Sequence, residues 1–239
     1  MEFLVFDVKA RYAHFRKIYT NSSSLSYSVP PRTTIEGLIA AILGYERDSY
    51  YDIFSSENLK IAVKKLSSTR KIVQSLNYIK ATSIGKIISP DEHTQIPFEI
   101  LTGENGVGFR IYVNHTDDEI FHRLEELLKE NKVHFIPYLG AAPFNCSINY
   151  VGKFKAIEEE SNDFIKIETV IRKDLIDDNG IDVLNINGVL IKEKMPRDFL
   201  PGRVIKEVKD YLYEENGNAI RVKLKSKYYN INNENIVLM

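Results

Sequence analysis

The N-terminal part of the chain combines strand-like and helix-like hydrophobic patterns. Residues 2–10 are rich in Phe and Val and predict a buried strand. Apolar side chains then recur at helical spacing and predict a helix over about 34–43, through Ile35, Leu38, Ile39, Ile42 and Leu43. Thr33 and Glu36 fit a capping box, and Gly44 stands where a left-handed C-cap is favoured. The sequence therefore begins with a strand followed by a capped helix.

A second amphipathic helix is predicted from Thr116, with Glu119 again at the capping-box spacing. Its apolar stripe consists of Ile120, Phe121, Leu124, Leu127 and Leu128. Strands are predicted at 60–66, 107–114, 132–136 and 147–151. The order strand, helix, strands, helix, strand is typical of a ferredoxin-like fold of the RRM type, with both helices on one face of an antiparallel sheet. Residues 90–108 would then form an inserted hairpin or loop.

The C-terminal part has the pattern of a separate, mostly β region. An acidic run at 158–163 marks a shift in composition and is the predicted domain boundary. Beyond it, residues 164–171, 181–191 and 220–224 are predicted strands, separated by turn residues. We therefore predict an α+β protein with a ferredoxin-like domain at 1–155 and a small, mostly antiparallel β-rich region at 156–239.

Composition favours a soluble globular protein. The chain has 239 residues, of which 44% are hydrophobic and 27% charged, and no apolar run approaches the roughly 20 residues of a membrane span. Residues 1–6 are apolar but lack a basic leader and a small-residue cleavage site, which favours a strand over a signal peptide. We expect a cytoplasmic protein without a membrane partner. The single cysteine, Cys146, is expected to be a small buried side chain.

Positive charge is concentrated in one segment, although the net charge is only −1. Residues 58–90 contain no Asp or Glu, and their cations are Lys60, Lys64, Lys65, Arg70, Lys71, Lys80 and Lys86. Aromatic and hydroxyl side chains lie among them, including Tyr78. Contact with phosphates would explain the missing carboxylates, and a solvated charged face is the alternative.

A second basic stretch follows the first predicted strand. Basic and aromatic side chains alternate there: Lys9, Arg11, Tyr12, His14, Phe15, Arg16, Lys17 and Tyr19. Arginines bind phosphates, and aromatic faces stack on unpaired bases. Pro30 and Pro31 are predicted to hold Arg32 and the N-terminus of the first helix where an anionic backbone meets both. The predicted RNA contacts are Arg11, Arg16, Lys17, Arg32, Tyr78, Lys80 and Tyr138, with a solvated polar loop as the alternative.

The sequence gives little support for a metal site, a nucleotide-binding loop or a catalytic carboxylate cluster. The five histidines lack close metal-ligand spacing, so we predict no metal site and no cofactor. The glycines between Gly103 and Gly108 do not follow the order of a nucleotide fingerprint and predict a hairpin turn. Asp117, Asp118 and Glu119 are acids in the first turn of a helix, which the helix dipole favours without any catalytic role.

Two segments resemble a known family. Ser28-Val-Pro-Pro-Arg-Thr-Thr-Ile-Glu-Gly-Leu-Ile-Ala-Ala-Ile-Leu-Gly44 is similar to the signature after the first strand of the CRISPR-associated Cas five family, which belongs to the RAMP superfamily. Tyr138-Leu-Gly-Ala-Ala-Pro-Phe-Asn-Cys-Ser-Ile148 resembles a later Tyr-Leu-Gly segment of that family. The resemblance covers the N-terminal region well and the C-terminal region loosely, and it suggests subtype I-B.

The resemblance implies a RAMP-type ferredoxin-like domain in a type I surveillance (Cascade) complex for antiviral defence. Such a subunit would hold the 5′ handle of the crRNA and contact both a backbone subunit of the Cas seven family and a large subunit of the Cas eight family. The assembled complex would recognise target DNA through base pairing to the guide. The insertion after Pro90 would correspond to the family's thumb.

Two alternatives remain open. One subtype of the family cuts repeat RNA without a metal and is expected to use a tyrosine with an adjacent Lys-His pair. Tyr45 and His115 are the candidate catalytic residues here, but Asn114 stands in place of the lysine. A histidine with a structural role at a helix start is the competing interpretation of His115. The second alternative is a protein-only adapter whose basic segments contact no RNA.

Overall fold

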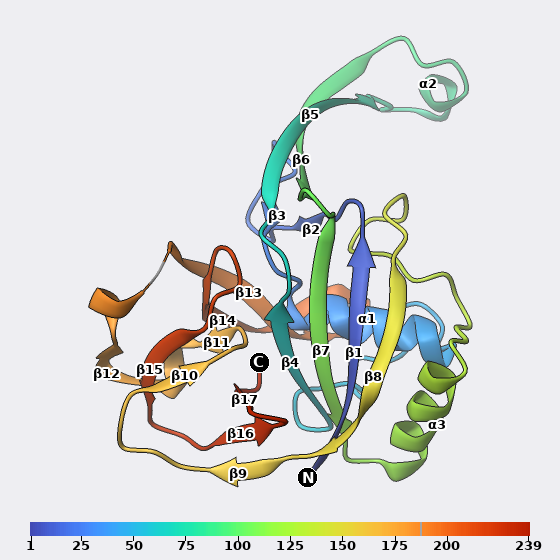
Figure 1. Ribbon diagram of the computed structural model, residues 1–239. Helices are drawn as coiled ribbons and strands as arrows, with labels where there is room; N and C mark the ends of the chain where they lie inside the picture. The colour runs from blue at the N-terminus through green and yellow to red at the C-terminus, as the bar shows by residue number, and fades with distance from the viewer. Residues whose placement is uncertain (187) are drawn as a thin grey trace.

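A central antiparallel sheet organises the protein, whose computed structural model describes residues 1–186 and 188–239. The sheet has the strand order β4-β7-β1-β8 (Figure 1). Its strands are β1 (Glu2–Ala10), β4 (Leu59–Lys65), β7 (Val107–His115) and β8 (Ser147–Lys155). Every neighbouring pair in this sheet is antiparallel. Two helices, α1 (Arg32–Leu43) and α3 (Asp118–Lys129), lie against the sheet, as predicted in number and approximate position.

Strand β1 is buried on both faces, which explains its nearly continuous apolar sequence. Leu4 and Phe6 pack in the main hydrophobic cluster with residues of α1. Phe3 and Val5 belong to a second cluster on the other face, which includes Ile231 near the C-terminus. A strand covered on one face would alternate between apolar and polar residues, whereas a strand covered on both faces does not.

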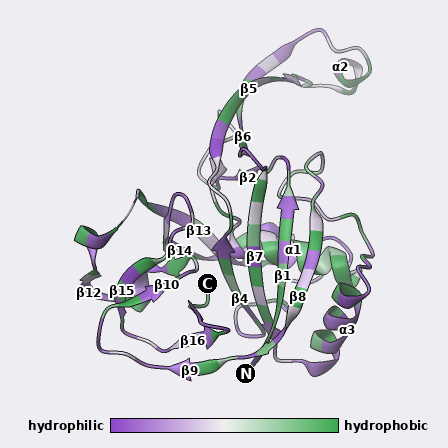
Figure 2. Ribbon diagram, viewed as in Figure 1, coloured by the Kyte–Doolittle hydropathy of each residue, from purple (hydrophilic) through white to green (hydrophobic). Residues whose placement is uncertain are grey.

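The predicted capping boxes are both wrong, although the helices are present. The N-cap of α1 is Pro31, which makes no side-chain capping bond, and Gly44 ends the helix in the left-handed conformation as predicted. The N-cap of α3 is Asp117, one residue later than predicted, and its carboxylate accepts hydrogen bonds from the backbone N–H groups of Glu119 and Ile120. A carboxylate at this position also has a favourable interaction with the helix dipole. In Figure 2, α1 is mainly hydrophobic, whereas α3 has both hydrophobic (green) and hydrophilic (purple) residues.

The strand predicted at 132–136 is absent. His134 and Phe135 instead donate backbone hydrogen bonds to the carbonyl groups of Ile42 and Ala41, at 3.2 and 2.9 Å. These carbonyls belong to the last turn of α1, where no further helical N–H is available to them. The segment therefore satisfies the end of a helix and does not join the sheet.

A long two-stranded hairpin projects from the sheet (Figure 1). It consists of β5 (Arg70–Ile79) and β6 (His93–Thr102), with the short helix α2 (Ile84–Ile88) at its tip. We call residues 70–102 the projecting hairpin. The insertion predicted at 90–108 is therefore misplaced, because the pairing partner of β6 lies within the basic segment that precedes Pro90. The segment Gly103–Gly108 contains a turn, but not the predicted hairpin turn, because it connects β6 to β7 and these two strands belong to different sheets.

The remaining strands form small antiparallel sheets of two or three strands. Near the N-terminus, β2 (Phe15–Arg16) pairs with β3 (Ser26–Tyr27). The C-terminal strands are β9 (Ile157–Glu159), β10 (Ile165–Ile167), β11 (Ile171–Arg172), β12 (Ile176–Ile181), β13 (Leu190–Leu200), β14 (Val204–Glu214), β15 (Ile220–Leu224), β16 (Tyr228–Ile231) and β17 (Glu234–Ile236). They form the sheets β10-β15-β12, β11-β14-β13 and β17-β16-β9. The fold is thus mixed α/β with mostly small antiparallel sheets.

The C-terminal strand predictions have different outcomes. The strand predicted at 220–224 is confirmed as β15, and the segment 164–171 is divided between β10 and β11. Residues 181–191 do not form one strand, because the 3₁₀ turn η2 (Val183–Asn185) interrupts them; Asn187 lies outside the described residues. Short 3₁₀ turns η1 (Lys173–Leu175) and η3 (Pro201–Arg203) complete the elements.

The main hydrophobic cluster extends across the predicted boundary at residue 155. Val170, Met195, Tyr211 and Met239 belong to the same buried cluster as the core of the central sheet and α1. A smaller cluster lies within the C-terminal region. Within residues 1–186 and 188–239, no helix is long and apolar enough to cross a membrane.

Candidate functional site

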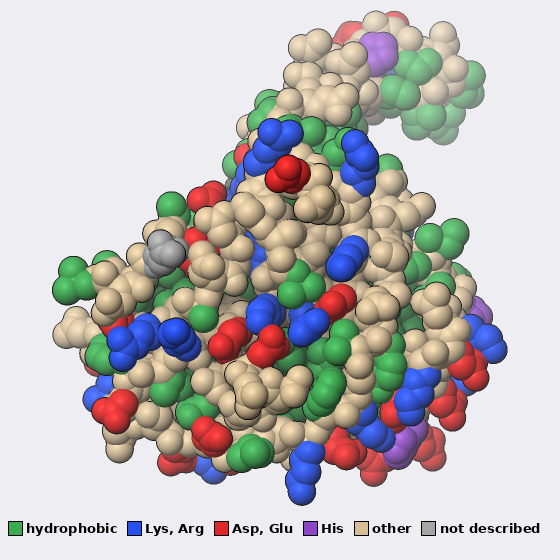
Figure 3. Space-filling view, viewed as in Figure 1, with side chains coloured by type: hydrophobic (Ala, Val, Ile, Leu, Met, Phe, Trp, Pro, Cys, Tyr) green, Lys and Arg blue, Asp and Glu red, His purple; other side chains and the backbone are tan. Residues whose placement is uncertain are grey.

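A cationic cleft lies at the root of the projecting hairpin and has a volume of about 640 Å³. The end of β1, the start of β5, the turn between β6 and β7, and the start of β8 contribute to its walls. Its lining residues are Lys9, Ala10, Arg11, Tyr12, Arg70, Ile72, Thr102, Gly103, Glu104, Asn105, Gly106 and Ser147. In the space-filling view, basic side chains flank acidic ones near this root (Figure 3).

Glycines in the β6–β7 turn allow this cleft to form. Gly106 has a φ of 79°, and a Cβ atom there would collide with the carbonyl oxygen of Ala10. A Cβ atom on Gly103 would lie 2.7 Å from the carbonyl oxygen of Ser68, just before β5. The hydroxyl of Thr102 also donates a hydrogen bond to the carbonyl of Arg11 at 3.2 Å. Because the turn approaches both strands closely, Arg11 and Arg70 come from distant parts of the sequence to one cleft.

The cations of the cleft are free to interact with an external anion. Lys9, Arg11 and Arg70 are all exposed, and within the described part of the chain none of them forms an ion pair. The Arg11 guanidinium carbon lies 5.8 Å from the centre of the Tyr12 ring. Guanidinium groups bind phosphate oxygens, and a tyrosine ring is a stacking surface for a base. The arrangement suits a phosphate backbone with unpaired bases.

The prediction that Arg32 contacts RNA is wrong, because Arg32 does not face the surface. It is fully buried. Its Nη1 donates to Asp198 Oδ1 at 2.9 Å and to the carboxylate of Glu36, and its Nη2 donates to the carbonyls of Phe54 and Leu59 at 2.9 and 2.6 Å. The arginine after the two prolines thus joins α1 to β13 and cannot contact RNA in this conformation.

The carboxylates around Arg32 complete a buried polar network. Asp198 also accepts hydrogen bonds from the Ser56 backbone N–H and hydroxyl, at 2.9 and 2.6 Å. Burial raises the pKa of Glu36 to about 8, and the neighbouring Arg32 charge opposes that rise. Buried charges are tolerated when they are paired in this way, and removing one partner is costly.

The other predicted RNA contacts lie apart from one another. Arg16 is exposed, whereas Lys17 is largely buried and pairs with Glu193 at 2.6 Å. Tyr78 and Lys80 lie in the distal part of the projecting hairpin, and Tyr138 belongs to a different cleft beside α1. Of the seven predicted residues, Arg11 alone lines the cationic cleft described above.

The carboxylates missing from the basic segment come from other parts of the chain. Lys64 pairs with Glu234 at 2.7 Å, and Lys71 pairs with Glu99 at 3.1 Å. Lys80 pairs with Glu92 at 2.8 Å across the projecting hairpin. The basic segment as a whole is therefore not an open cationic surface. Lys9 and Arg70, which are not among the predicted RNA contacts, line the cleft beside the turn glycines.

The candidate catalytic residues Tyr45 and His115 both pack against Phe54. The ring centres of Tyr45 and His115 lie 5.3 and 5.9 Å from that of Phe54. His115 is buried; its Nε2 donates to the carbonyl of Ile53 at 3.0 Å, and its Nδ1 accepts from the backbone N–H of Asp117 at 2.9 Å. Burial raises the pKa of Tyr45. Both ring nitrogens of His115 have structural partners, so neither is available as a general base in this conformation.

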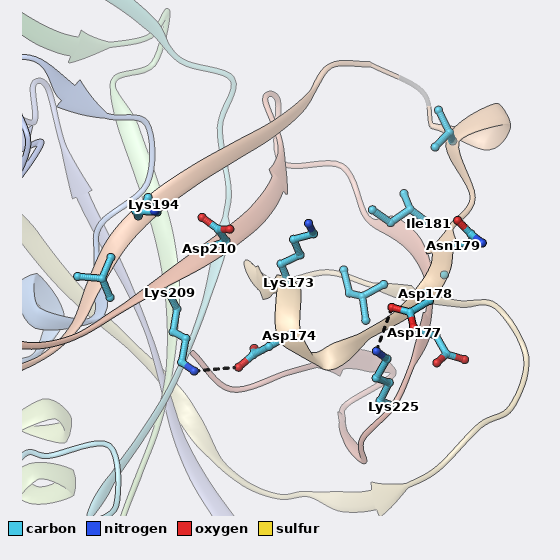
Figure 4. Close-up of a pocket in the computed structure, with 14 residues that line it drawn as sticks. Lys173, Asp174, Asp177, Asp178, Asn179, Ile181, Lys194, Lys209, Asp210 and Lys225 are labelled. Atoms are coloured by element: carbon cyan, nitrogen blue, oxygen red, sulfur yellow. Dashed lines mark hydrogen bonds and ion pairs between the residues drawn. The ribbon is translucent and has the colours of Figure 1, made fainter.

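A larger cleft of about 890 Å³ lies in the C-terminal region. Figure 4 shows lysines and aspartates around it, with ion pairs between Lys209 and Asp174 at 3.3 Å and between Lys225 and Asp178 at 3.2 Å. Its charges largely neutralise one another, unlike those of the cationic cleft. Within the described ranges 1–186 and 188–239, no group of three or more His, Cys, Asp or Glu side chains could hold a metal ion.

The protein is thus a mixed α/β protein with a cationic cleft at the root of the projecting hairpin. The family described as CRISPR-associated protein (Cas_Cas5) matches residues 3–207. The chain therefore belongs to this family, and the family resemblance noted in the sequence is confirmed. No curated protein matches the chain.

Among solved structures, a CRISPR protein of known structure shares the fold of this chain. A CRISPR protein from Archaeoglobus fulgidus has 17% sequence identity and a TM-score of 0.62, with 99% of this chain and 98% of that chain covered. A chain of a CRISPR RNA-guided surveillance complex has 11% identity and a TM-score of 0.46, with 98% of this chain and 90% of that chain covered. At 17% identity, the similarity to the Archaeoglobus fulgidus protein concerns the fold alone.

Proposed function

We propose that this protein is a crRNA-binding structural subunit of a type I CRISPR surveillance complex of subtype I-B, and that it holds the 5′ handle of the crRNA. The observation that carries the proposal is the cationic cleft, in which Lys9, Arg11 and Arg70 have no ion-pair partner among the described residues. Membership of the Cas five family supports it. The protein would act in the cytoplasm as part of antiviral defence.

The architecture supports the finer description of the fold. The order β4-β7-β1-β8, with α1 and α3 on one face, is the arrangement expected of a ferredoxin-like RAMP domain. The projecting hairpin would correspond to the family's thumb. We propose that residues 1–155 form this domain and residues 156–239 a small β-rich region, with a hydrophobic core shared between them.

Two surfaces fit protein partners in such a complex. Ile84, Ile87 and Ile88 at the tip of the projecting hairpin are 77%, 62% and 79% exposed. A separate cleft beside α1 is lined by small residues of that helix and by the exposed side chain of Ile136. Exposed apolar patches favour protein contacts. We propose that they contact subunits of the Cas seven and Cas eight families, and that target DNA is met through the assembled complex.

The test uses purified full-length protein and end-labelled CRISPR repeat RNA in EDTA. Retention on a native gel measures binding, and a denaturing gel of the same incubation measures RNA integrity. We expect salt-sensitive retention of intact RNA, and loss of roughly tenfold or more in affinity for the double variant Arg11→Glu/Arg70→Glu. Arg123→Glu on α3 is the matched control, because Arg123 is 62% exposed and does not line the cleft.

The two alternatives give different results in the same experiment. A discrete RNA product that disappears in His115→Ala would favour a metal-independent endoribonuclease. Unchanged affinity and an unchanged salt dependence in the Arg11→Glu/Arg70→Glu variant would contradict the proposed site. No retention of RNA by the wild-type protein would favour the protein-only adapter.

A further inference from the structure

Glu104 is an unexpected residue for a surface that binds phosphates. Within the described part of the chain it is the only carboxylate that lines the cationic cleft. It is exposed and forms no ion pair there, although Lys9, Arg11 and Arg70 line the same cleft. A carboxylate in this position weakens the attraction of the cleft for a phosphate backbone. Its presence therefore calls for a different interaction with the bound molecule.

The turn that carries Glu104 is held firmly. The backbone N–H of Gly106 donates to the carbonyl of Gly103 at 3.2 Å, which closes the turn. Ser67 fixes it from β4's side, since its hydroxyl accepts from the backbone N–H of Gly108 at 3.0 Å and donates to the carbonyl of Gly106 at 3.4 Å. The close approach of Gly103 and Gly106 to neighbouring backbone prevents the turn from moving inward. Glu104 consequently projects from a fixed point on the wall of the cleft.

The chemistry of a carboxylate selects among the bases. An ionised carboxylate only accepts hydrogen bonds, and it can accept two side by side. Guanine presents two adjacent N–H donors, N1–H and N2–H, on its Watson–Crick edge. Adenine and cytosine place an acceptor beside their single amino group, and uracil places its one N–H between two acceptors. Unpaired bases in RNA are commonly recognised on this edge.

We propose that Glu104 selects a guanine of the RNA in the cationic cleft by accepting hydrogen bonds from N1–H and N2–H. Arg11 and Arg70 would hold the adjoining phosphates, and the Tyr12 ring would support a stacked base. This inference rests on the proposed function and adds a base preference to it. The carboxylate would set the preference for guanine, whereas the cations would supply the affinity for RNA of any sequence.

The experiment replaces each guanine of the repeat RNA in turn with inosine, which lacks the N2 amino group. The matched control is 7-deazaguanine, which keeps the Watson–Crick edge. For the full-length wild-type protein we expect one position at which inosine lowers the affinity about tenfold and 7-deazaguanine does not. In Glu104→Gln this ratio should fall toward one, with no loss of affinity for the inosine RNA. Glu57→Gln, which alters an exposed carboxylate outside the cleft, should keep the ratio.

The outcomes separate this inference from the proposed function. Equal binding of all guanine and inosine RNAs by the wild-type protein, or an unchanged ratio in Glu104→Gln, would overturn the guanine assignment alone. No RNA binding by the wild-type protein would overturn both. Arg11→Glu should weaken binding to every RNA while keeping the guanine-to-inosine ratio. Circular dichroism of each variant checks that the turn substitution has not altered the fold.

Discussion

The sequence around Arg32 is compatible with two roles: binding an anion at the surface, or pairing with carboxylates in the interior. An arginine after two prolines at a helix N-terminus suits an anion on the surface, but here it lies in the interior with Glu36 and Asp198. Asp198 is 166 residues away in the sequence, so local pattern cannot reveal the pairing. Arg32 thus joins distant parts of the fold, whereas Arg11 and Arg70 are exposed and form no ion pair within the described residues.

The first prediction concerns Asp198→Ala. It removes an ion-pair partner of Arg32 and both hydrogen bonds from Ser56. We expect the free energy of unfolding to fall by about 3–5 kcal/mol, because a buried charge loses compensation. Urea denaturation followed by circular dichroism measures it. Asp210→Ala, which removes a surface pair with Lys192, is the control and should cost about 1 kcal/mol or less. Equal losses in both variants would contradict the structural role of the buried network.

At the level of elements, the projecting hairpin contributes surface and little core. Within residues 77–95 no residue is buried, whereas Ile100 and Leu101 at its root are buried. At the root, His14 stacks on Phe98 with ring centres 4.0 Å apart, and its Nδ1 lies 2.7 Å from the carbonyl oxygen of Glu99. The root thus belongs to the body of the fold, whereas the distal part contributes no buried residue.

The second prediction replaces residues 77–95 with Asn-Gly. Leu76 and Ile96 are paired across the ladder, so a two-residue turn can join them. We expect the free energy of unfolding to change by about 1 kcal/mol or less, since the removed residues pack against no core. Binding to RNA or partner subunits through Tyr78, Lys80 and the apolar tip should be lost. A large loss of stability in thermal denaturation would instead show that the distal hairpin is needed for folding.

At the level of the whole molecule, the two predicted regions share hydrophobic clusters. Tyr211 and Met239 complete the core under α1, and Ile231 and Ile236 cover the second face of the central sheet. The backbone N–H groups of Val170 and Met239 also donate to β4, at 2.8 and 2.9 Å. They satisfy carbonyl groups along an edge that would otherwise be open.

The third prediction concerns the fragment 1–155. We expect it to lack a cooperative thermal transition, because it would expose one face of the central sheet and leave Arg32 without Asp198. Near-UV and far-UV circular dichroism measure the transition. Co-expression with the fragment 156–239 is the control and should restore it. A fragment 1–155 that melts cooperatively near the temperature of the full chain would show that the boundary separates independent folding units.

Local patterns predicted the elements whose stability is local. The apolar stripe from Ile35 to Leu43 predicts α1, and Gly44 predicts where the helix ends. Both predictions succeed because helix periodicity and a left-handed cap depend on neighbouring residues. The segment 132–136 was mistaken for a strand because its backbone partners are in α1, at a distant position in the sequence. For the candidate site, the neighbouring residues in the sequence indicate Arg11, whereas Arg70 reaches the cleft only through the close approach of the β6–β7 turn to the end of β1 and the start of β5.

The sequence by itself determined the core helices, the strands of the central sheet and the family, since these depend on periodicity and on short motifs. The tertiary structure alone decided which cations are free. Lys71 and Lys80 meet carboxylates across the projecting hairpin, Arg32 is enclosed by Glu36 and Asp198, and Arg11 and Arg70 remain exposed beside Glu104. The physical reason is that a charge is available to a ligand only where the fold supplies no opposite charge, and that pairing depends on strand register and close backbone approach across the whole chain.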